Sequence, residues 1–257
     1  MIYFILIFIF IFGLIIGSFL NCLIYRLHKN KSMMGRSFCP KCKKQIAWYD
    51  NIPILSFLFL NGKCRYCKQK ISWQYLLVEF ITGILFVIAF IIEFSVFQNQ
   101  NILMLFRSWF IISVMIVIFI YDLKWYLILD IITLPASLIL LIWNLYLGMN
   151  WQNMLISVII GIGFFLSQFL ISRGKWIGGG DIRLGMLMGL SLGWPMILVA
   201  IILAYFIGSV IGILLILFKK KKIGSKIPLG IFLSTATVIT LFWGDIILDW
   251  YLNILKY

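Results

Sequence analysis

Acidic residues and histidine are scarce in this sequence. Among its 257 residues are eight aspartates and glutamates, against 22 lysines and arginines, and a single histidine, His28. No serine and histidine pair of the kind that serves nucleophilic hydrolysis can be recognised, and we expect no chemical role for His28. Charged residues make up only 12% of the chain, whereas 63% is hydrophobic and the mean hydropathy is +1.09. Because a soluble domain is only about half apolar, these values predict an integral membrane protein.

The strict alternation of polar and apolar residues that marks a membrane-spanning β-barrel is also missing. The sequence instead contains eight apolar segments, most of which reach the roughly 20 residues that a helix needs to cross the hydrocarbon. It therefore predicts an all-α polytopic membrane protein with about eight transmembrane helices. The segments are roughly 2–24, 74–95, 102–121, 127–148, 152–172, 182–194, 195–218 and 228–250. As a helix, segment 182–194 would extend only about 20 Å, so it either spans short or has its ends buried in protein.

A cleavable signal peptide is not apparent at the start of the chain. The first apolar segment is preceded by no basic residue and is followed by no small-residue cleavage site. We therefore expect this segment to be a retained membrane helix.

The basic residues lie almost entirely on one side of an eight-helix arrangement. This side holds 20 of the 22 lysines and arginines, and only Arg107 and Lys256 remain for the other. Such asymmetry is the positive-inside rule, and it places the basic segments in the cytosol and both termini outside. These segments are 25–73 and the turns near 122–126, 173–181 and 219–227. The net charge of +14 thus indicates topology and a contact with membrane lipid, and we expect no nucleic-acid partner.

Four cysteines occur as two pairs in the first long cytosolic loop. Cys39 and Cys42 form CPKC, Cys64 and Cys67 form CRYC, and 21 residues separate the pairs. This spacing is typical of a zinc ribbon, and a shell of four thiolates leaves no position for a substrate, so we expect a structural metal. Two disulfides are the alternative, which a reducing cytosol disfavours. Cys22, within the first apolar segment, is expected to serve packing.

Three of the acidic residues lie at the cytosolic ends of apolar segments. Asp122 ends the third segment, Asp130 begins the fourth, and Asp181 begins the sixth, directly after three glycines. Ionisable groups at membrane helices are costly and are therefore functional candidates. Asp122 and Asp181 are expected at the same depth, where two carboxylates that share one proton suit an aspartic protease. Spacing alone equally allows Asp181 to be a helix N-cap and Asp122 a solvated boundary charge.

Several stretches resemble the type IV prepilin peptidase family, membrane aspartyl proteases of the GxGD kind. The stretch GGGDIRLG is similar to the family's second aspartate motif, and YDLKWYLILDIITLP is similar to its first, with Leu129 in place of a proline. The match extends over most of the chain. Further similar stretches are GSFLNCLIYRL (17–27), the loop with paired cysteines, SWQYLLVEFITGILF (72–86) and KIPLGIFL (226–233).

The resemblance implies an activity and residues for it. Members cleave the basic leader of prepilins and pseudopilins after a glycine, at the cytosolic face of the bacterial plasma membrane. By resemblance, Asp122 and Asp181 are the catalytic pair on a protease domain formed by residues 102–257, and Asp130 lies beside the pair. Gly178 and Gly180 are the glycines of the GxGD loop, where the backbone can approach a substrate closely.

Many members also methylate the new N-terminus with S-adenosylmethionine. The sequence contains no glycine-rich nucleotide loop after a strand, so a soluble methyltransferase fold is not expected. By resemblance this activity belongs to residues 1–101, with the first two helices and the cysteine loop. Asn21 and Glu79 are the polar groups there that could meet an amine.

Two alternatives remain open at this point. One is another GxGD protease, a preflagellin peptidase or a protease of the signal-peptide-peptidase kind, although the cysteine loop and the GSFLN stretch fit these less well and no Pro-Ala-Leu motif is present. The other is a proton-coupled transporter that uses Asp122 and Asp181 as a relay. Transporters often show internal repeats and sites near the bilayer midplane, whereas this chain shows no repeat and both acids lie at the membrane edge.

Overall fold

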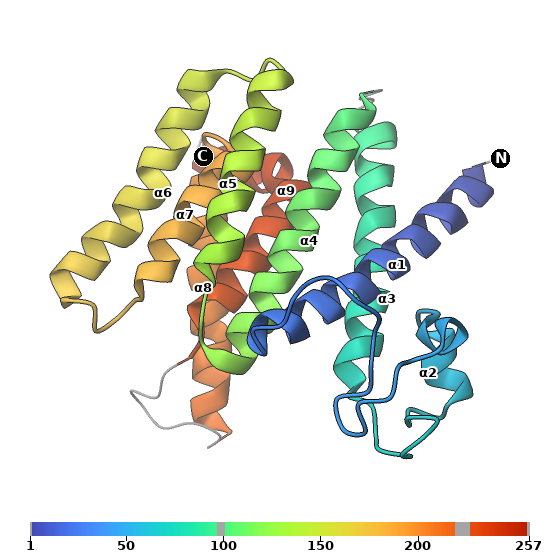
Figure 1. Ribbon diagram of the computed structural model, residues 1–257. Coiled ribbons are helices and arrows are strands. Elements are labelled where there is room, and N and C mark those ends of the chain that lie inside the picture. Colours follow the sequence, from blue (N-terminus) through green and yellow to red (C-terminus); the bar gives the residue numbers. More distant parts are fainter. Residues whose placement is uncertain (1, 97–100, 219–226, 256–257) are drawn as a thin grey trace. The chain divides into compact units, whose positions relative to one another are not determined.

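The computed structural model describes residues 2–96, 101–218 and 227–255 (Figure 1). Residues 219–226 of the basic turn predicted near 219–227, and Lys256, lie outside these residues. The chain divides into two compact units, 1–105 and 106–257. The division of activities between residues 1–101 and 102–257 stays a prediction.

The eight apolar segments correspond to eight helices. Six of these are long and apolar enough to cross a membrane, and α5 and α7 are shorter. The prediction of an all-α polytopic membrane protein is therefore confirmed. The helices are α1 (Ile2–His28), α3 (Trp73–Ile91, continued by the π-helical turn η2, Ile92–Val96), α4 (Ile102–Trp125), α5 (Asp130–Tyr146), α6 (Trp151–Ser172), α7 (Gly179–Leu192), α8 (Met196–Leu217) and α9 (Leu229–Leu255).

In the first unit, α1 and α3 pack closely through small residues. A Cβ atom at Gly13 would lie 2.7 Å from the Cα of Gly83, and one at Gly17 would lie 2.7 Å from the Cα of Glu79. Glycines spaced by four let two helix backbones approach inside a membrane, where lipid supplies no hydrophobic drive for association. This packing fixes the register of α1 against α3 and brings Asn21 and Glu79 to the interface between the two helices.

In the second unit, α7 contacts α5, α6, α8 and α9. Its side against α6 carries Gly185 and Gly189, and larger residues would not fit there. A Cβ at Gly185 would lie 2.6 Å from the carbonyl oxygen of Gly161, and one at Gly189 would lie 2.7 Å from the carbonyl oxygen of Ser157. The hydroxyl of Ser157 also donates to the Gly189 carbonyl at 2.9 Å. The sequence thus holds α7 in one register along α6.

The C-terminal end of α7 is held by buried polar side chains. The guanidinium of Arg107 donates to the carbonyls of Leu190 and Ser191 at 3.2 and 2.7 Å, and through Nε to Asn144 Oδ1 at 2.6 Å. Asn144 in turn donates to the Leu190 carbonyl at 2.8 Å. The last carbonyls of a helix have no partner within it, and a cation there also complements the helix dipole. This confirms that segment 182–194 has an end buried in protein.

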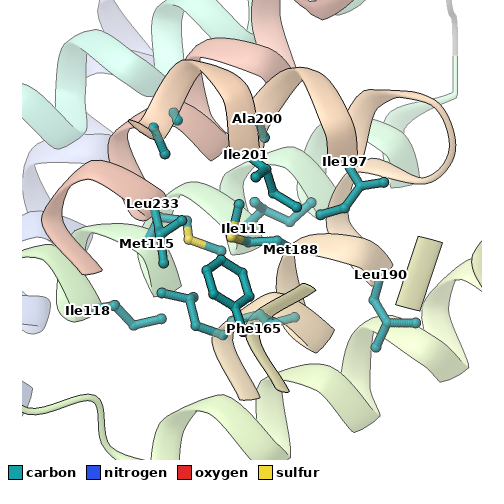
Figure 2. Close-up of a cluster of buried hydrophobic side chains, with 14 of the residues drawn as sticks. Ile111, Met115, Ile118, Phe165, Met188, Leu190, Ile197, Ala200, Ile201 and Leu233 are labelled. Carbon is teal, nitrogen blue, oxygen red and sulfur yellow. The ribbon is translucent and has the colours of Figure 1, made fainter. Parts of the chain in front are cut away.

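The hydrophobic core of the second unit surrounds α7. Figure 2 shows Phe165 of α6 at the centre, with Met115 of α4 and Met188 of α7 beside its ring. Leu233 of α9 and Ile197 of α8 belong to the same cluster. Because helices from most of the unit meet here, the position of α7, and hence of Asp181 in its first turn, depends on the packing of the whole unit.

Candidate active site

Asp122 lies in the last turn of α4 and faces the start of α9. Its side chain is 4% exposed, and its Oδ2 accepts a hydrogen bond from the amide of Ile231 at 3.2 Å. A Cβ at Gly230 would lie 2.8 Å from the same oxygen, so only glycine leaves room for the carboxylate. The amides of a helix's first turn and its dipole favour a negative group. Asp122 is therefore not a solvated boundary charge.

Asp181 is the third residue of α7 and is 7% exposed. Its Oδ2 accepts a hydrogen bond from the amide of Gly178 at 2.8 Å. The N-cap of α7 is Gly178, so Asp181 is not the N-cap residue that the sequence allowed, although its carboxylate makes a capping contact with the Gly178 amide. Since α7 begins at Gly179, Gly179 and Gly180 are helical, and Gly178 precedes the helix.

The two carboxylates come together in the folded unit. Asp122 and Asp181 are close enough to interact electrostatically. Ile128 contacts both Gly180 of α7 and Gly230 of α9: a Cβ at Gly180 would lie 2.9 Å from the Cβ of Ile128, and one at Gly230 would lie 3.2 Å from its Cδ1. Gly180 is thus required for a close approach within the chain, whereas Gly178 supplies the amide that orients Asp181.

Asp130 does not share this setting. It begins α5, and its carboxylate forms an ion pair with Arg183 of α7. The side chains of Asp130 and Arg183 are 49% and 44% exposed. The structure therefore separates a buried pair of acids from an exposed acid that already has a cationic partner.

The four paired cysteines form one cluster in the first unit. Their sulfur atoms all lie within 4.8 Å of one another, and Cys39 Sγ is 3.8 Å from Cys67 Sγ. A tetrahedral zinc site with Zn–S bonds of ~2.3 Å has sulfurs about 3.8 Å apart. All four cysteines are free, so the disulfide alternative finds no support. The cluster suits a metal ion with four thiolate ligands.

The two cysteine pairs adopt the same local structure. Lys43 and Lys68 each follow the second cysteine of a pair and have φ values of 58° and 57°. The amides of Cys39 and Cys64 donate to the carbonyls of Lys44 and Gln69, both at 2.9 Å. The Cys67 amide is the main cause that lowers the pKa of the Cys64 thiol to about 7, whereas the Gln69 amide, which lowers the pKa of Cys67, is outweighed by burial and the neighbouring cysteines, which raise that pKa to about 11.

An ion pair joins two parts of the loop that carries the cluster. Arg65 donates to both carboxylate oxygens of Asp50, from Nε at 2.8 Å and from Nη2 at 2.6 Å. This contact with Arg65 keeps the pKa of Asp50 below its usual value. Arg65 is thus bound to an acid beside the cysteine cluster, while Lys44 lies over the ring of Tyr66.

Asn21 and Glu79 both bridge segments of the first unit. Asn21 donates to the Tyr75 carbonyl at 3.1 Å and accepts from Gln74 Nε2 at 3.2 Å. Glu79 is buried, and its Oε2 accepts the amide of Ile54 at 2.8 Å. The other end of the Gln74 amide, Oε1, is buried without a hydrogen-bond partner in the described part of the chain.

Gly230, Ile231 and Arg183 contact the candidate residues, yet the sequence alone suggested no role for them. A signal for the first two was present, since both fall in the stretch KIPLGIFL that resembled a family motif. Pairing of Arg183 with Asp130 could not have been foreseen, because 53 residues separate them.

Two family models match the chain. The bacterial peptidase A24 N-terminal domain matches residues 11–93, and the type IV leader peptidase family matches residues 109–213. The second match contains Asp122 and Asp181, and the first contains the cysteine cluster. No solved structure gives a significant match.

Curated relatives named prepilin leader peptidase/N-methyltransferase align along most of the chain. The protein of Aeromonas salmonicida is 31% identical over 95% of this chain and 93% of its own length. That of Pseudomonas aeruginosa is 29% identical over 94% and 91%, and that of Vibrio cholerae is 37% identical over 71% and 76%. With two matching family models and relatives of this extent, the chain belongs to the type IV prepilin leader peptidase family.

Proposed function

We propose that this protein is a membrane-embedded aspartic endopeptidase that removes the basic leader of type IV prepilins or pseudopilins after a glycine. The observation that carries the proposal is the pairing of Asp122 and Asp181, two buried carboxylates that interact at the starts of α9 and α7. The names of the relatives supply the substrate class. A signal-peptide-peptidase-like or preflagellin activity accounts less well for the cysteine cluster and the N-terminal family match.

Two buried like charges so close together disfavour double ionisation, so the pair carries one proton in its working state. Each acid accepts an amide through Oδ2, and we assign Oδ1 of each to the chemistry. The ionised carboxylate takes a proton from water as the water oxygen attacks the scissile carbonyl, and the protonated one donates its proton to the carbonyl oxygen. When the C–N bond breaks, the leaving amine takes the proton that came from water, and a hydroxyl of the tetrahedral intermediate returns its proton to the other carboxylate, so the pair is again singly protonated.

The relatives' names also support N-methylation of the new N-terminus, which we assign to the first unit. S-adenosylmethionine would supply an electrophilic methyl group bound to a positively charged sulfur. Two features of the unit suit such a cationic group or the substrate amine: the buried carboxylate of Glu79, and the buried Gln74 Oε1, which lacks a partner among the described residues. Asn21 positions the Gln74 side chain through its hydrogen bond.

We assign a structural Zn²⁺ to Cys39, Cys42, Cys64 and Cys67. The loop around them contains only short helical pieces, η1 (Trp48–Asn51) and α2 (Leu55–Phe59). A metal therefore supplies the stabilisation that this segment lacks in core packing.

We place the protein in the bacterial plasma membrane, with Asp122 and Asp181 at the cytosolic face. Support comes from the six helices that can cross a membrane and from the basic residues that the positive-inside rule assigns to the cytosol. Its partners are then prepilin or pseudopilin substrates and membrane lipid.

The decisive experiment is cleavage of a purified prepilin by the purified protein in detergent, followed by mass spectrometry of both products. Cleavage after a glycine, lost in the Asp122→Asn and Asp181→Asn variants, is the expected result. No cleavage of any prepilin tested, together with proton-coupled uptake in vesicles that depends on Asp122, would instead support a transporter.

A further inference from the structure

A basic leader must bind to a protein of net charge +14. Recognition by long-range attraction is therefore excluded, and the leader needs a local carboxylate. All eight acids lie among the described residues, so each can be checked for whether its carboxylate is available to an incoming cation.

Within the second unit, the acids differ sharply in accessibility. Asp122 and Asp181 are buried and belong to the proposed catalytic pair. Asp245 and Asp249 are exposed, but they follow Gly230 in α9 by 15 and 19 residues, which is about 22 and 28 Å along a helix. Asp130 alone combines an exposed carboxylate with a position beside α7.

The acids of the first unit offer no comparable group. The side chain of Asp50 is 6% exposed and holds Arg65 through both oxygens. Glu79 is buried and binds the amide of Ile54. Glu93 lies in η2, beyond the opposite end of α3 from the cysteine loop. By elimination, the available carboxylate is that of Asp130.

We propose that Asp130 binds a basic side chain of the leader, and that Arg183 holds this carboxylate until a lysine or arginine of the substrate replaces it. The inference rests on the proposed function. An ion pair between two half-exposed side chains is weak, so exchange of one cation for another costs little. Arg183 follows Asp181 by two residues in α7. Because Asp130 pairs with Arg183, its carboxylate lies near the helical turn that carries Asp181.

This arrangement links leader charge to the position of the scissile bond. A leader held at Asp130 approaches the N-terminal turn of α7, where Asp181 lies, and its glycine enters next to the catalytic pair. A neutral leader would meet Arg183 still bound to Asp130 and would gain no contact there. Asp130 is thereby a specificity residue that acts on binding, outside the chemical step.

The test compares two substrates with the full-length protein in detergent: a prepilin with its basic leader, and the same prepilin with each leader lysine and arginine changed to glutamine. For Asp130→Asn we expect KM for the basic substrate to rise about threefold, because the ion pair that the substrate loses is half exposed and replaces the pair with Arg183. We expect kcat to stay within about twofold, and KM for the neutral substrate to be unchanged. Asp245→Asn, at the far end of α9, is the matched control and should change neither substrate.

A second variant should change KM for the basic substrate in the opposite direction. Arg183→Gln leaves Asp130 without its partner in the chain and should lower KM for the basic substrate severalfold. In the double variant with Asp130→Asn this gain should vanish, because the two effects act through one carboxylate. An Arg183→Gln gain that persists in the double variant, or an Asp130→Asn effect that is equal for both substrates, overturns the inference. Either result leaves the proposed protease intact, whereas an active Asp122→Asn would overturn the protease itself.

Discussion

Asp122 of α4 accepts a hydrogen bond at 3.2 Å from the amide of Ile231, which follows it by 109 residues in the chain. The bond ties one candidate catalytic acid to the first turn of α9, and the corresponding bond from Gly178 ties the other to the start of α7. Each carboxylate is thus oriented by backbone amides, which hold a fixed geometry without a flexible partner. Pre-set groups of this kind are what proton transfer in a hydrolytic site requires.

Replacing either buried acid by its amide should abolish cleavage. Asp122→Asn and Asp181→Asn keep the shape of the side chain but cannot carry the proton in either role, so we expect a loss of about a thousandfold or more. Both variants should still insert and accumulate, because the amide is cheaper to bury than a carboxylate. The measurement is turnover of a prepilin together with protein abundance in the membrane.

Asp130→Asn should retain measurable activity in the same assay, since its carboxylate is exposed and paired with Arg183. If Asp130→Asn is inactive while Asp122→Asn cleaves normally, the first catalytic acid has been assigned to the wrong residue.

The glycines around the acids should differ in their tolerance of alanine. A Cβ at Gly180 would lie 2.9 Å from Ile128, and one at Gly230 would lie 2.8 Å from Asp122 Oδ2, whereas one at Gly179 would have no neighbour within 4 Å. Gly180→Ala and Gly230→Ala should therefore shift the segments that carry the acids and lower kcat about a hundredfold, the scale expected for a misplacement near 1 Å. Gly179→Ala serves as the control and should stay within about twofold of the parent.

Single-turnover cleavage of a prepilin at saturating enzyme measures this effect directly. Wild-type activity in Gly230→Ala would show that the Asp122 carboxylate has another position available, contrary to the tight geometry at the start of α9.

Much of the fold could be predicted because hydrophobicity alone determines it. Each apolar segment became a helix, and Asp122 and Asp181 came close together because the membrane limits where a helix can end, whereas Asp130 remained exposed. The paired cysteines carried an equally local signal, since each pair forms its own tight turn before the two meet.

Contacts between distant segments could not be predicted in this way. The sequence predicted only that Arg107 lies on the outer side. In the structure it is 6% exposed and binds the end of α7, more than 80 residues later in the chain. A charge in an apolar helix already suggests a partner, but the sequence offers no means of choosing among many carbonyls. The role of Gly230 depends similarly on the approach of α4 to α9.

Removing Arg107 should loosen α7. Arg107→Met leaves the Ser191 carbonyl and Asn144 Oδ1 without their donor, whereas the Leu190 carbonyl keeps its bond from Asn144, and each buried group left unsatisfied costs about 1–3 kcal/mol. We expect the Tm in detergent to fall by about 4–10 °C and activity to fall with it. Arg107→Lys retains the charge but loses the planar fork, so its Tm should lie between those of Arg107→Met and the parent.

The exposed Lys175→Gln is the charge-matched control and should not change the Tm. An unchanged Tm in Arg107→Met would mean that the end of α7 is satisfied by other groups.

The cysteine cluster should bind about one zinc ion per chain. Replacing Cys39 and Cys42 by serine removes two ligands, so elemental analysis should find almost no zinc, and the loop should become sensitive to protease because metal binding supplies its folding free energy. Cys22→Ser, in α1 and outside the cluster, should leave the zinc content unchanged. A zinc-free preparation of the parent protein in which these four thiols are paired as disulfides would refute the assignment.

Cleavage should require the apolar helix of the substrate to be held in a membrane or detergent micelle. Asp122 lies in the last turn of α4, a helix that can span a membrane, and Asp181 interacts with it from the first turn of α7, so the scissile bond must be presented at the membrane boundary. Binding energy from the substrate helix, remote from the reacting atoms, can hold that bond against the two carboxylates and thereby raise the rate of the chemical step. A leader peptide truncated just after the cleavage site should thus have a kcat/KM lower by about a hundredfold or more, a larger loss than its few missing contacts at the site would cause.

The measurement compares kcat/KM of the full prepilin with that of the truncated peptide in the same detergent. Equal values would show that the substrate helix does not position the bond, and the leader alone would then have to supply recognition.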